Sequence, residues 1–595
     1  IYRRYLEAGA DLITANTFSS QRISQADYHL EDAAREMAYE GARLARIECD
    51  KFSTPDKPRF VAGDVGPTNK TCSMSPDVSN PAAREITYDE LFVDVCEQVD
   101  GLIEGGVDVI LIETIFDTLN CKAMIDAAVT TMKKHGVDLP IMVSLTVSDL
   151  AGRTLSGQTV DAFLASLSPY PIFSVGMNCA FGAPQMKPFI EHMGEIAPYY
   201  ISAHPNAGLP NEMGEYDETA ESMAPKIKEF LDEGLVNVIG GCCGTSPEFI
   251  ARYAEMAKGH QVVPKPDVMW LSGLDVLKVD DTVKLPMDAS RFVNVGERCN
   301  VAGSRKFLRL INEKKYEEAL DIARKQVADG AAVVDVNMDD GLLDAKAEMT
   351  NFLNMVAAEP EIAKVPIMID SSKWDVITAG LKCCQGKCIV NSISLKEGEE
   401  VFVSHAKDVM RYGAAVVVMC FDEIGQATTY ERRIEIASRA YHILVDEVGM
   451  NSLDIIFDPN VLAIATGMEE HDNYAVEFIR ATEWIHKNLP GAHVSGGVSN
   501  LSFSFRGNTY IREAIHAVFL HYAQLKGMDF GIVNAKARKD YAKLPENQRE
   551  LIEDVVLNRR KGAADDLIEL ANEIKEQMDA AKAAAKAGGV VPPKP

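Results

Sequence analysis

Three cysteines have the sequence context of a metal site. Cys242 and Cys243 are adjacent and lie between glycines, in Gly240-Gly-Cys-Cys-Gly244, and Cys179 ends the segment Gly176-Met-Asn-Cys179. The flanking glycines let the backbone bend enough to aim both neighbouring sulfurs at one point. Three thiolates favour Zn(II) in tetrahedral geometry and leave its fourth position open. A substrate thiol bound there loses its proton at neutral pH and stays nucleophilic, so the pattern predicts thiol activation.

Each of these cysteines by itself is more typical of a buried core residue. A second group, Cys383, Cys384 and Cys388, lies where a predicted helix runs into a strand, and we interpret it as packing. The 12 histidines contain no His-x-x-x-His pair, so no histidine-based zinc site competes. The sequence therefore favours the first group as the zinc ligands.

Hydrogen-bond acceptors form a second candidate site in the C-terminal half. They stand at the ends of predicted strands and include Glu297, Asp335, Asn337, Asp370, Asn391, Asp422, Asp458 and Asn500. A concave site ringed by Asp and Asn, with no lysine or histidine base, suits a neutral heterocycle with several N–H donors, such as a pterin, better than a phosphate. Asp and Asn caps at strand-to-helix turns explain any single position, but the set together favours a binding site.

A scaffold that gathers strand ends is needed to position these residues. A short sequence pattern, in which a predicted helix ends at glycine and an apolar strand follows, begins at Glu7, Glu104, Asp329 and Tyr412. Many such corners indicate a parallel sheet with helices outside. We therefore predict an α/β protein with two (β/α)8 TIM barrels in tandem, whose reactive groups come from the carboxyl ends of the strands.

Counting strands sets the domain boundaries. Seven candidates precede residue 260, at 11–18, 59–67, 108–117, 140–148, 173–181, 199–208 and 236–244. Eight follow, at 292–300, 333–340, 366–371, 388–394, 415–423, 454–462, 493–500 and 529–535. We expect residues 1–260 to form a barrel lacking its N-terminal strand, which makes the chain a fragment. Residues 261–290 are a predicted linker, 291–545 a complete barrel, and 546–595 a short C-terminal helical segment and tail.

Composition excludes several classes of protein. The 595 residues are 47% hydrophobic and 25% charged, which is typical of a globular protein rather than a disordered one. No apolar run reaches the ~20 residues that cross a bilayer. The net charge of −28 argues against a nucleic-acid or membrane-surface partner. Twelve cysteines without a signal peptide indicate a reducing cytoplasm, and we expect a monomer.

Motifs in the first barrel resemble the homocysteine S-methyltransferase family. They are Asn16-Thr-Phe, Gly176-Met-Asn-Cys179 and Gly240-Gly-Cys-Cys-Gly-Thr-Ser-Pro247. The resemblance implies that Cys179, Cys242 and Cys243 bind zinc, and that zinc binds the sulfur of homocysteine. It also implies that Glu113 binds the substrate amino group, with Asn16 and Asn178 nearby. Strand-end hydrogen bonding is the alternative interpretation of these last three.

Residues 292–535 resemble the pterin-binding barrels of dihydropteroate synthases and methyltetrahydrofolate methyltransferases. The motifs are Asn294-Val-Gly-Glu-Arg-Cys-Asn300, Ile369-Asp-Ser-Ser372, Phe457-Asp-Pro459 and Gly496-Gly-Val-Ser-Asn-Leu-Ser-Phe503. The resemblance implies that Asp370, Asn391 and Asp458 hold the pterin, and that Asn500 contacts its N5. Glu297 and Arg506 would complete the pocket, and Asn500 and Asp370 are the candidate catalytic residues. No lysine follows Gly-Gly-Val-Ser, which disfavours a synthase.

Both barrels in this order, followed by Leu551-Ile-Glu-Asp-Val-Val-Leu-Asn-Arg-Arg560, are similar to the front half of the cobalamin-dependent methionine synthase family. The resemblance implies methyl transfer from 5-methyltetrahydrofolate, through cobalamin, to zinc-activated homocysteine. The Asp-x-His-x-x-Gly segment by which that family ligates cobalamin is absent from the sequence, so we expect a separate cobalamin-binding module to be the partner. Two alternatives stay open, a non-catalytic zinc and folate scaffold and a corrinoid-independent homocysteine S-methyltransferase.

Overall fold

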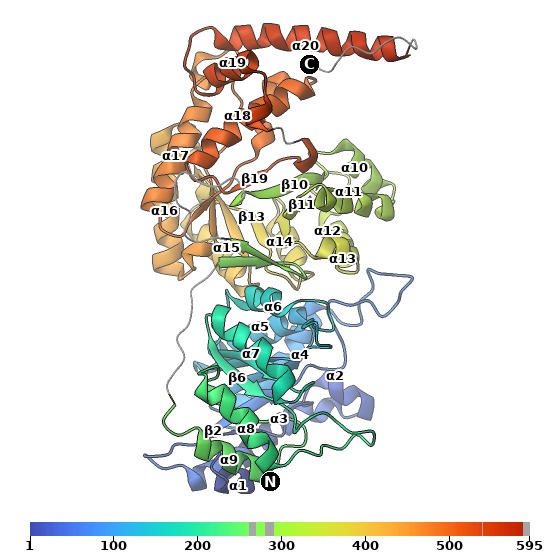
Figure 1. Cartoon of the computed structure of the whole chain (residues 1–595), viewed down its shortest axis with the longest axis vertical. Coiled ribbons are helices and arrows are strands. Elements are labelled where there is room, and N and C mark those ends of the chain that lie inside the picture. Colours follow the sequence, from blue (N-terminus) through green and yellow to red (C-terminus); the bar gives the residue numbers. More distant parts are fainter. Residues whose placement is uncertain (261–268, 280–290, 538–539, 587–595) are drawn as a thin grey trace.

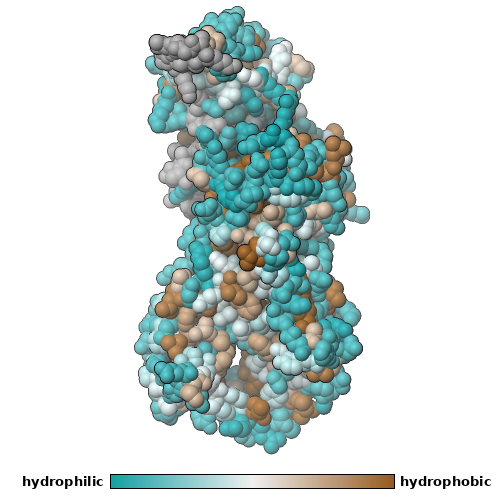
Figure 2. All heavy atoms as spheres, turned by 90° about the vertical axis from the view of Figure 1, so that its right-hand side faces the viewer, coloured by the Kyte–Doolittle hydropathy of each residue, from teal (hydrophilic) through white to brown (hydrophobic). Residues whose placement is uncertain are grey.

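Two α/β units follow each other along the long axis of the molecule, with two further helices beyond the second unit (Figure 1). The computed structural model describes residues 1–260, 269–279, 291–537 and 540–586. Among these residues, no helix is both long enough and apolar enough to cross a membrane. On the face shown in Figure 2, hydrophobic side chains are scattered among hydrophilic ones.

Seven parallel strands form the first sheet, in the order of the sequence. They are β1 (Leu12–Thr14), β2 (Phe60–Val65), β3 (Val109–Ile115), β4 (Ile141–Leu145), β5 (Ser174–Asn178), β6 (Tyr200–His204) and β7 (Val238–Ile239). In the described part of the chain β1 pairs only with β2, and β7 only with β6. The seven-strand prediction for this incomplete barrel is therefore confirmed.

Helices lie around this sheet (Figure 1). They are α1 (Tyr2–Glu7), α2 (Arg22–Gln25), α3 (Ala34–Phe52), α4 (Tyr88–Glu104), α5 (Thr118–His135), α6 (Val160–Leu167), α7 (Ala183–Ile196), α8 (Ala220–Asp232) and α9 (Pro247–Met256). Local signals set their ends. In α5, for example, the Asp117 side chain accepts from the backbone N–H groups of Leu119 and Asn120, and Gly136 ends the helix at φ 66°.

Eight parallel strands form the second barrel, as predicted. They are β10 (Val293–Asn300), β11 (Val333–Asn337), β12 (Ile367–Asp370), β13 (Ile389–Ile393), β14 (Ala415–Met419), β17 (Ile455–Asp458), β18 (His493–Val494) and β19 (Phe530–Ile532). A bridge between Gly497 and Ile532 joins the segment after β18 to β19 and closes the ring. The predicted strand 493–500 is shorter than expected, because the chain turns into a 3-10 helix at Val498–Asn500 after two glycines.

The helices of the second unit follow the same alternation. They are α10 (Arg305–Asn312), α11 (Tyr316–Ala328), α12 (Ala345–Ala357), α13 (Pro360–Ala363), α14 (Trp374–Leu381), α15 (Glu399–Arg411), α16 (Tyr430–His442), α17 (Tyr474–Asn488) and α18 (Thr509–Leu525). A small hairpin of β15 (Phe421–Asp422) and β16 (Gly425–Gln426) follows β14. The predicted C-terminal helical segment consists of α19 (Glu546–Val556), which packs on α18, and α20 (Ala563–Lys586).

An antiparallel hairpin lies within the predicted linker. Its strands are β8 (Met269–Ser272) and β9 (Val276–Val279). Leu271 and Val279 of the hairpin belong to the buried cluster inside the second barrel, with residues such as Val293, Val333 and Met368. The remaining positions of 261–290 lie outside the described residues. This hairpin therefore covers the amino end of the second barrel, the end at which its strands begin.

Strand periodicity decides which side chains reach each barrel mouth. In the first barrel Ala62, Leu111 and Met142 form a small interior cluster. Successive side chains on a strand alternate between faces, so the residue two positions later points to the same interior, one layer nearer the carboxyl end. Asp64 and Glu113 occupy that next layer. In the second barrel, the residues two positions after interior apolar residues of the strands are Asp335, Asp370, Asn391 and Asp458.

The first barrel packs against the amino end of the second. The Lys122 ammonium of α5 is buried and donates to the Gly386 carbonyl at 2.6 Å. The Arg411 guanidinium donates to the Asp126 carboxylate at 2.8 Å, and the rings of Tyr88 and Tyr412 pack edge to face, 5.8 Å apart. Since these contacts occupy the amino end, the mouth of the second barrel points away from the first barrel.

A buried ion pair at this interface gives a stability prediction. Lys387 Nζ lies 2.6 Å from Asp454 Oδ1, with side chains 1% and 6% exposed, and it also donates to Ser168 Oγ of the first unit. Removing one member of a buried pair leaves an uncompensated charge, so we expect Lys387→Ala to lower the free energy of unfolding by ~3–5 kcal/mol, measured by urea denaturation. The partly exposed pair of Lys382 with Asp89 provides the control, since Lys382→Ala should cost ~0–1 kcal/mol. Equal effects of the two variants would contradict this assignment.

Candidate functional site

The three predicted metal ligands converge at the carboxyl end of the first barrel. The sulfur atoms of Cys179, Cys242 and Cys243 all lie within 4.8 Å of one another, and Cys179 Sγ is 3.8 Å from Cys243 Sγ. Cys179 and Cys242 are half-buried and Cys243 is exposed, so the cluster is open to solvent on one side. Three thiol donors at this spacing fit a tetrahedral zinc ion with one position free for a ligand.

The backbone around the cluster adopts conformations that aim the sulfurs. Cys179 follows β5 at φ 60°, and its N–H donates to the His204 carbonyl at 3.1 Å. Gly244 lies at φ +79°, where a Cβ would come within 2.6 Å of Tyr216. A Cβ on Gly241 would meet Thr245 Oγ1 at 2.0 Å. Glycine is therefore required on both sides of the cysteine pair, which explains the Gly-Cys-Cys-Gly sequence.

The cysteines share their protons unequally. A hydrogen bond from the Cys242 thiol lowers the pKa of Cys179 to about 5, against the opposing effect of burial. The pKa of Cys242 is raised, because its thiol donates that bond and is partly buried, and burial also raises the pKa of Cys243. One thiolate is thus present among three sulfurs at neutral pH, which is a suitable start for binding a divalent cation.

Asn178 links the cysteines to β3. This side chain is only 1% exposed. Its Oδ1 accepts from the Thr114 N–H at 3.0 Å, and its Nδ2 donates to Thr114 Oγ1 at 2.9 Å and to Cys242 Sγ at 3.9 Å. Thr114 itself has φ 60°, an uncommon conformation for a β-branched residue and one that this contact holds in place. The Asn178 amide therefore supports the cluster, with its polar atoms already engaged by protein.

The other two predicted homocysteine ligands differ in their surroundings. Glu113, two residues beyond Leu111 on β3, is half-buried in the mouth, and burial raises its pKa. The negative charge of Cys179 raises the pKa of Glu113 further, so the Glu113 carboxyl lies near the cysteine cluster. Asn16 lies after β1 with an exposed side chain, and its N–H donates to the Tyr2 hydroxyl at 2.8 Å. Glu113 is thus placed beside the sulfurs, whereas Asn16 belongs to the rim.

Buried and half-buried acceptors also gather at the mouth of the second barrel. Asn300 Nδ2 lies 3.2 Å from both Asp335 Oδ2 and Asp370 Oδ2, and the Asn391 amide hydrogen-bonds to Asp335. Burial raises the pKa of Asp370 to about 6, and burial with the nearby Asp370 charge raises that of Asp335 well above its ordinary range. Two carboxyls, two amides and few donors make this site suitable for a ligand rich in N–H groups.

Asp458 completes the acceptor set from β17. It is buried, which raises its pKa to about 7, and its Oδ1 accepts from the Asn460 N–H at 2.9 Å. The fully buried Arg433 donates to the carbonyl oxygens of Pro459 at 2.6 Å and Asn460 at 3.2 Å, which fixes the turn after the strand. Arg433 thus supports Asp458 from behind the strand.

Glu297, Asn500 and Arg506 lie on the same side of this mouth. Ser499 Oγ donates to Glu297 Oε2 at 2.9 Å, which joins β10 to the turn that carries Asn500. The exposed Asn500 side chain lies over Gly497, where an added Cβ would come 3.1 Å from its Nδ2. The exposed Arg506 guanidinium stacks on Phe503 at 3.9 Å. Asn500 and Arg506 are therefore both exposed, and Asn500 is held beside Gly497 in the turn that follows β18.

Two buried carboxyls were not assigned from the sequence. Asp335 is named there only as one of the strand-end acceptors, and Asp64 only falls within the predicted strand 59–67. Each nevertheless lies among the other site groups, Asp64 with Glu113 and Asp335 with Asp370. One sequence feature could have indicated that these two carboxyls face the barrel interior. Each lies two residues beyond an interior apolar residue of the same strand.

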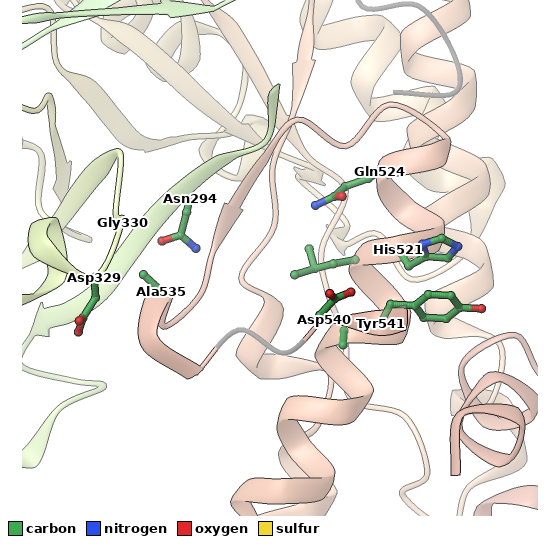
Figure 3. A pocket seen from close by; sticks show the side chains of 10 residues that line it. Asn294, Asp329, Gly330, His521, Gln524, Ala535, Asp540 and Tyr541 are labelled. Atoms are coloured by element: carbon green, nitrogen blue, oxygen red, sulfur yellow. The ribbon is translucent and has the colours of Figure 1, made fainter. Parts of the chain in front are cut away.

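An acidic cluster in the first unit and a cavity in the second unit lie apart from the predicted site residues. Asp100, Glu104 and His135 could by position hold a metal, but Arg35 and Lys134 already form ion pairs with Asp100 at 2.7 and 3.0 Å. A cavity of about 460 Å³ lies outside the second barrel, between α18, the end of α11 and the segment after β19 (Figure 3). None of the predicted site residues lines it.

Comparison with known families divides the chain as the fold does. Residues 1–257 match the family described as homocysteine S-methyltransferase, and residues 296–534 match the family described as pterin binding enzyme.

Solved structures similar to parts of the chain include three proteins of low sequence identity. The metallated homocysteine methyltransferase MmuM from Escherichia coli is 19% identical over 43% of this chain and 82% of that chain, with a TM-score of 0.34. The dihydropteroate synthase from Stenotrophomonas maltophilia is 17% identical over 45% and 93%, with a TM-score of 0.32. That from Xanthomonas albilineans, in complex with 7,8-dihydropteroate, is 14% identical over 44% and 91%, with a TM-score of 0.32.

Proposed function

We propose that this chain acts in the methylation of homocysteine by 5-methyltetrahydrofolate. It joins a homocysteine S-methyltransferase domain to a pterin-binding domain, which is the architecture of the N-terminal half of methionine synthase. The methyl group would pass through cobalamin, held by a separate cobalamin-binding module, and the products would be methionine and tetrahydrofolate. The observation that carries this proposal is the convergence of Cys179, Cys242 and Cys243 within 4.8 Å in one barrel, with a cluster of buried and half-buried acceptors in the other.

Each barrel contributes a distinct part of the chemistry. In the first, Cys179, Cys242 and Cys243 would hold zinc, and zinc lowers the pKa of a thiol that binds beside it. Glu113 would receive the ammonium group of homocysteine, and Asn178 keeps Cys242 oriented through its amide.

In the second barrel Asp370, Asn391 and Asp458 would accept hydrogen bonds from the pterin amino group and ring N–H groups, with Glu297 and Arg506 at the edge of the pocket. The Asn500 amide would contact N5 of the folate. Departure of the methyl group is faster when N5 is protonated, because an unprotonated tertiary amine is a poor leaving group. Burial raises the pKa of Asp458 to about 7, so near neutral pH this carboxyl is divided between acid and carboxylate and can both donate and accept. The pKa of Asp370 is raised only to about 6, so Asp370 is mostly a carboxylate and accepts hydrogen bonds.

Removing the metal tests the proposal. The purified chain should contain one zinc, and with supplied cobalamin, 5-methyltetrahydrofolate and homocysteine it should form methionine slowly. After chelation of zinc, methionine formation should fall by more than ~100-fold and return when zinc is added back. Folate demethylation by cobalamin provides the internal control, since it should not depend on zinc.

Three outcomes would contradict this function. Methionine formation that is indifferent to zinc would exclude the metal. Tight binding of zinc and folate without methyl transfer to cobalamin would favour a scaffold. Methionine formation from a small methyl donor without cobalamin would favour a corrinoid-independent homocysteine S-methyltransferase.

A further inference from the structure

Two carboxyls face each other inside the first barrel. Asp64 of β2 and Glu113 of β3 each lie two residues beyond an interior apolar residue, Ala62 and Leu111, on strands that are paired in parallel. Their carboxyl groups hydrogen-bond to one another. A carboxylate has no proton to donate, so this contact requires that one of the two be a carboxylic acid.

Asp64 has no other partner for its side chain. It is 4% exposed, and its Oδ1 is buried and receives no hydrogen bond from a donor in the described part of the chain. The Asp64 backbone is engaged, because Thr17 Oγ1 and Gln98 Nε2 donate to its carbonyl at 2.8 and 3.2 Å. One oxygen of the Asp64 carboxyl is thus buried and unsatisfied inside the barrel while the carboxyl is hydrogen-bonded to Glu113, a feature that calls for an explanation.

Among the residues that the structure describes, no positively charged side chain shifts the pKa of either member of this pair. The titratable groups that act on it from other elements are Tyr2 of α1 and Cys179 at the end of β5. Burial, with the charge of Glu113, raises the pKa of Asp64 well above its ordinary value, whereas the hydrogen bond with Asp64 opposes the rise at Glu113. Both effects place the shared proton on Asp64.

We propose that Asp64 is a positioning residue of the homocysteine site, which stays a neutral carboxylic acid and donates its hydrogen bond to the Glu113 carboxylate. Glu113 then offers one oriented negative charge to the substrate ammonium group. Two charged carboxylates there would leave an uncompensated charge in a buried site beside the thiolates, whereas one carboxylate and one ammonium neutralise each other. The inference rests on the proposed function, because it needs an amino-acid thiol at the cysteine cluster.

Two substitutions separate a neutral donor from an anion. Asp64→Asn keeps a hydrogen-bond donor without charge, and Asp64→Val removes the donor. Affinities of the zinc-loaded chain are measured by calorimetry for homocysteine and for 4-sulfanylbutanoate, which lacks only the amino group. We expect Asp64→Asn to bind homocysteine like the unaltered chain. Asp64→Val should bind it roughly tenfold more weakly, the size expected for a hydrogen bond to a charged group, with unchanged affinity for 4-sulfanylbutanoate.

The outcomes are distinct. An Asp64→Asn variant that loses the preference for homocysteine would show that Asp64 acts as an anion and overturn the inference. Retention of the full preference by Asp64→Val would also overturn it, while leaving the proposed function intact. Absence of any preference in the unaltered chain would overturn both. Zinc content and thermal midpoint are measured for each variant, and Asp64→Ala replaces Asp64→Val if that variant does not fold.

Discussion

We expect the Cys242→Ser variant to lose zinc and homocysteine methylation while it retains folate demethylation at the unaltered rate. A serine hydroxyl is a poor zinc ligand, and Cys242 is hydrogen-bonded to Cys179 and Asn178 within the cluster. Loss of a direct ligand should exceed the 10- to 100-fold effect of removing a supporting group, so we expect methylation to fall by more than ~100-fold. Metal analysis and assays of the two half-reactions measure these effects.

Cys96→Ser is the matched control, because Cys96 is a partly buried cysteine on α4 outside the cluster. It should retain zinc and both half-reactions. Folate demethylation is expected to survive Cys242→Ser because the second barrel turns its amino end, with Lys387 and Gly386, toward the first unit. Loss of both half-reactions in Cys242→Ser would show that the two sites are not independent.

The Asn500→Ala variant should have the opposite effect. Asn500 lies in the 3-10 turn after β18, beside Ser499, which is anchored to Glu297. If its amide assists protonation of N5, its loss should slow folate demethylation by roughly 100-fold, the lower end of the range for general acid–base assistance. Zinc content and homocysteine binding should not change. Single-turnover transfer of the methyl group to cobalamin measures the effect.

Asn488→Ala is the control for this change, because Asn488 is an exposed asparagine at the last position of α17, where its amide donates to the Trp484 carbonyl of the same helix. It should leave both half-reactions unaltered. A demethylation rate in Asn500→Ala equal to that of Asn488→Ala would remove Asn500 from the mechanism.

Much of the fold is readable from local sequence. Each of the fifteen expected strands has a counterpart, because an apolar β-branched run after a glycine-ended helix specifies a buried parallel strand without reference to the rest of the chain. The hairpin at residues 269–279 was missed, since a short pair of strands between charged segments has little periodicity of its own. Its stability comes from the barrel end that Leu271 and Val279 cover.

The candidate sites were readable in part. Residue type and strand-end position predicted Cys242, Asp370 and Asp458 as site residues, and the structure places them at or just after the carboxyl ends of their strands, which meet at one edge. Sequence did not indicate that Asn178 has its amide occupied by Thr114 and Cys242. Such pairings depend on strand register and on the bend at Thr114, and a local pattern does not encode them.

The sequence by itself determined the class of fold, the number of strands in each barrel and the residue types that end them, because the two-residue alternation of a strand and the glycine-ended helix are local properties. Only the tertiary structure decided which of those residues meet. Asp64 and Glu113 are 49 positions apart in the chain, and their carboxyls meet because adjacent parallel strands place both on the inner face of the barrel, where burial raises the pKa of each.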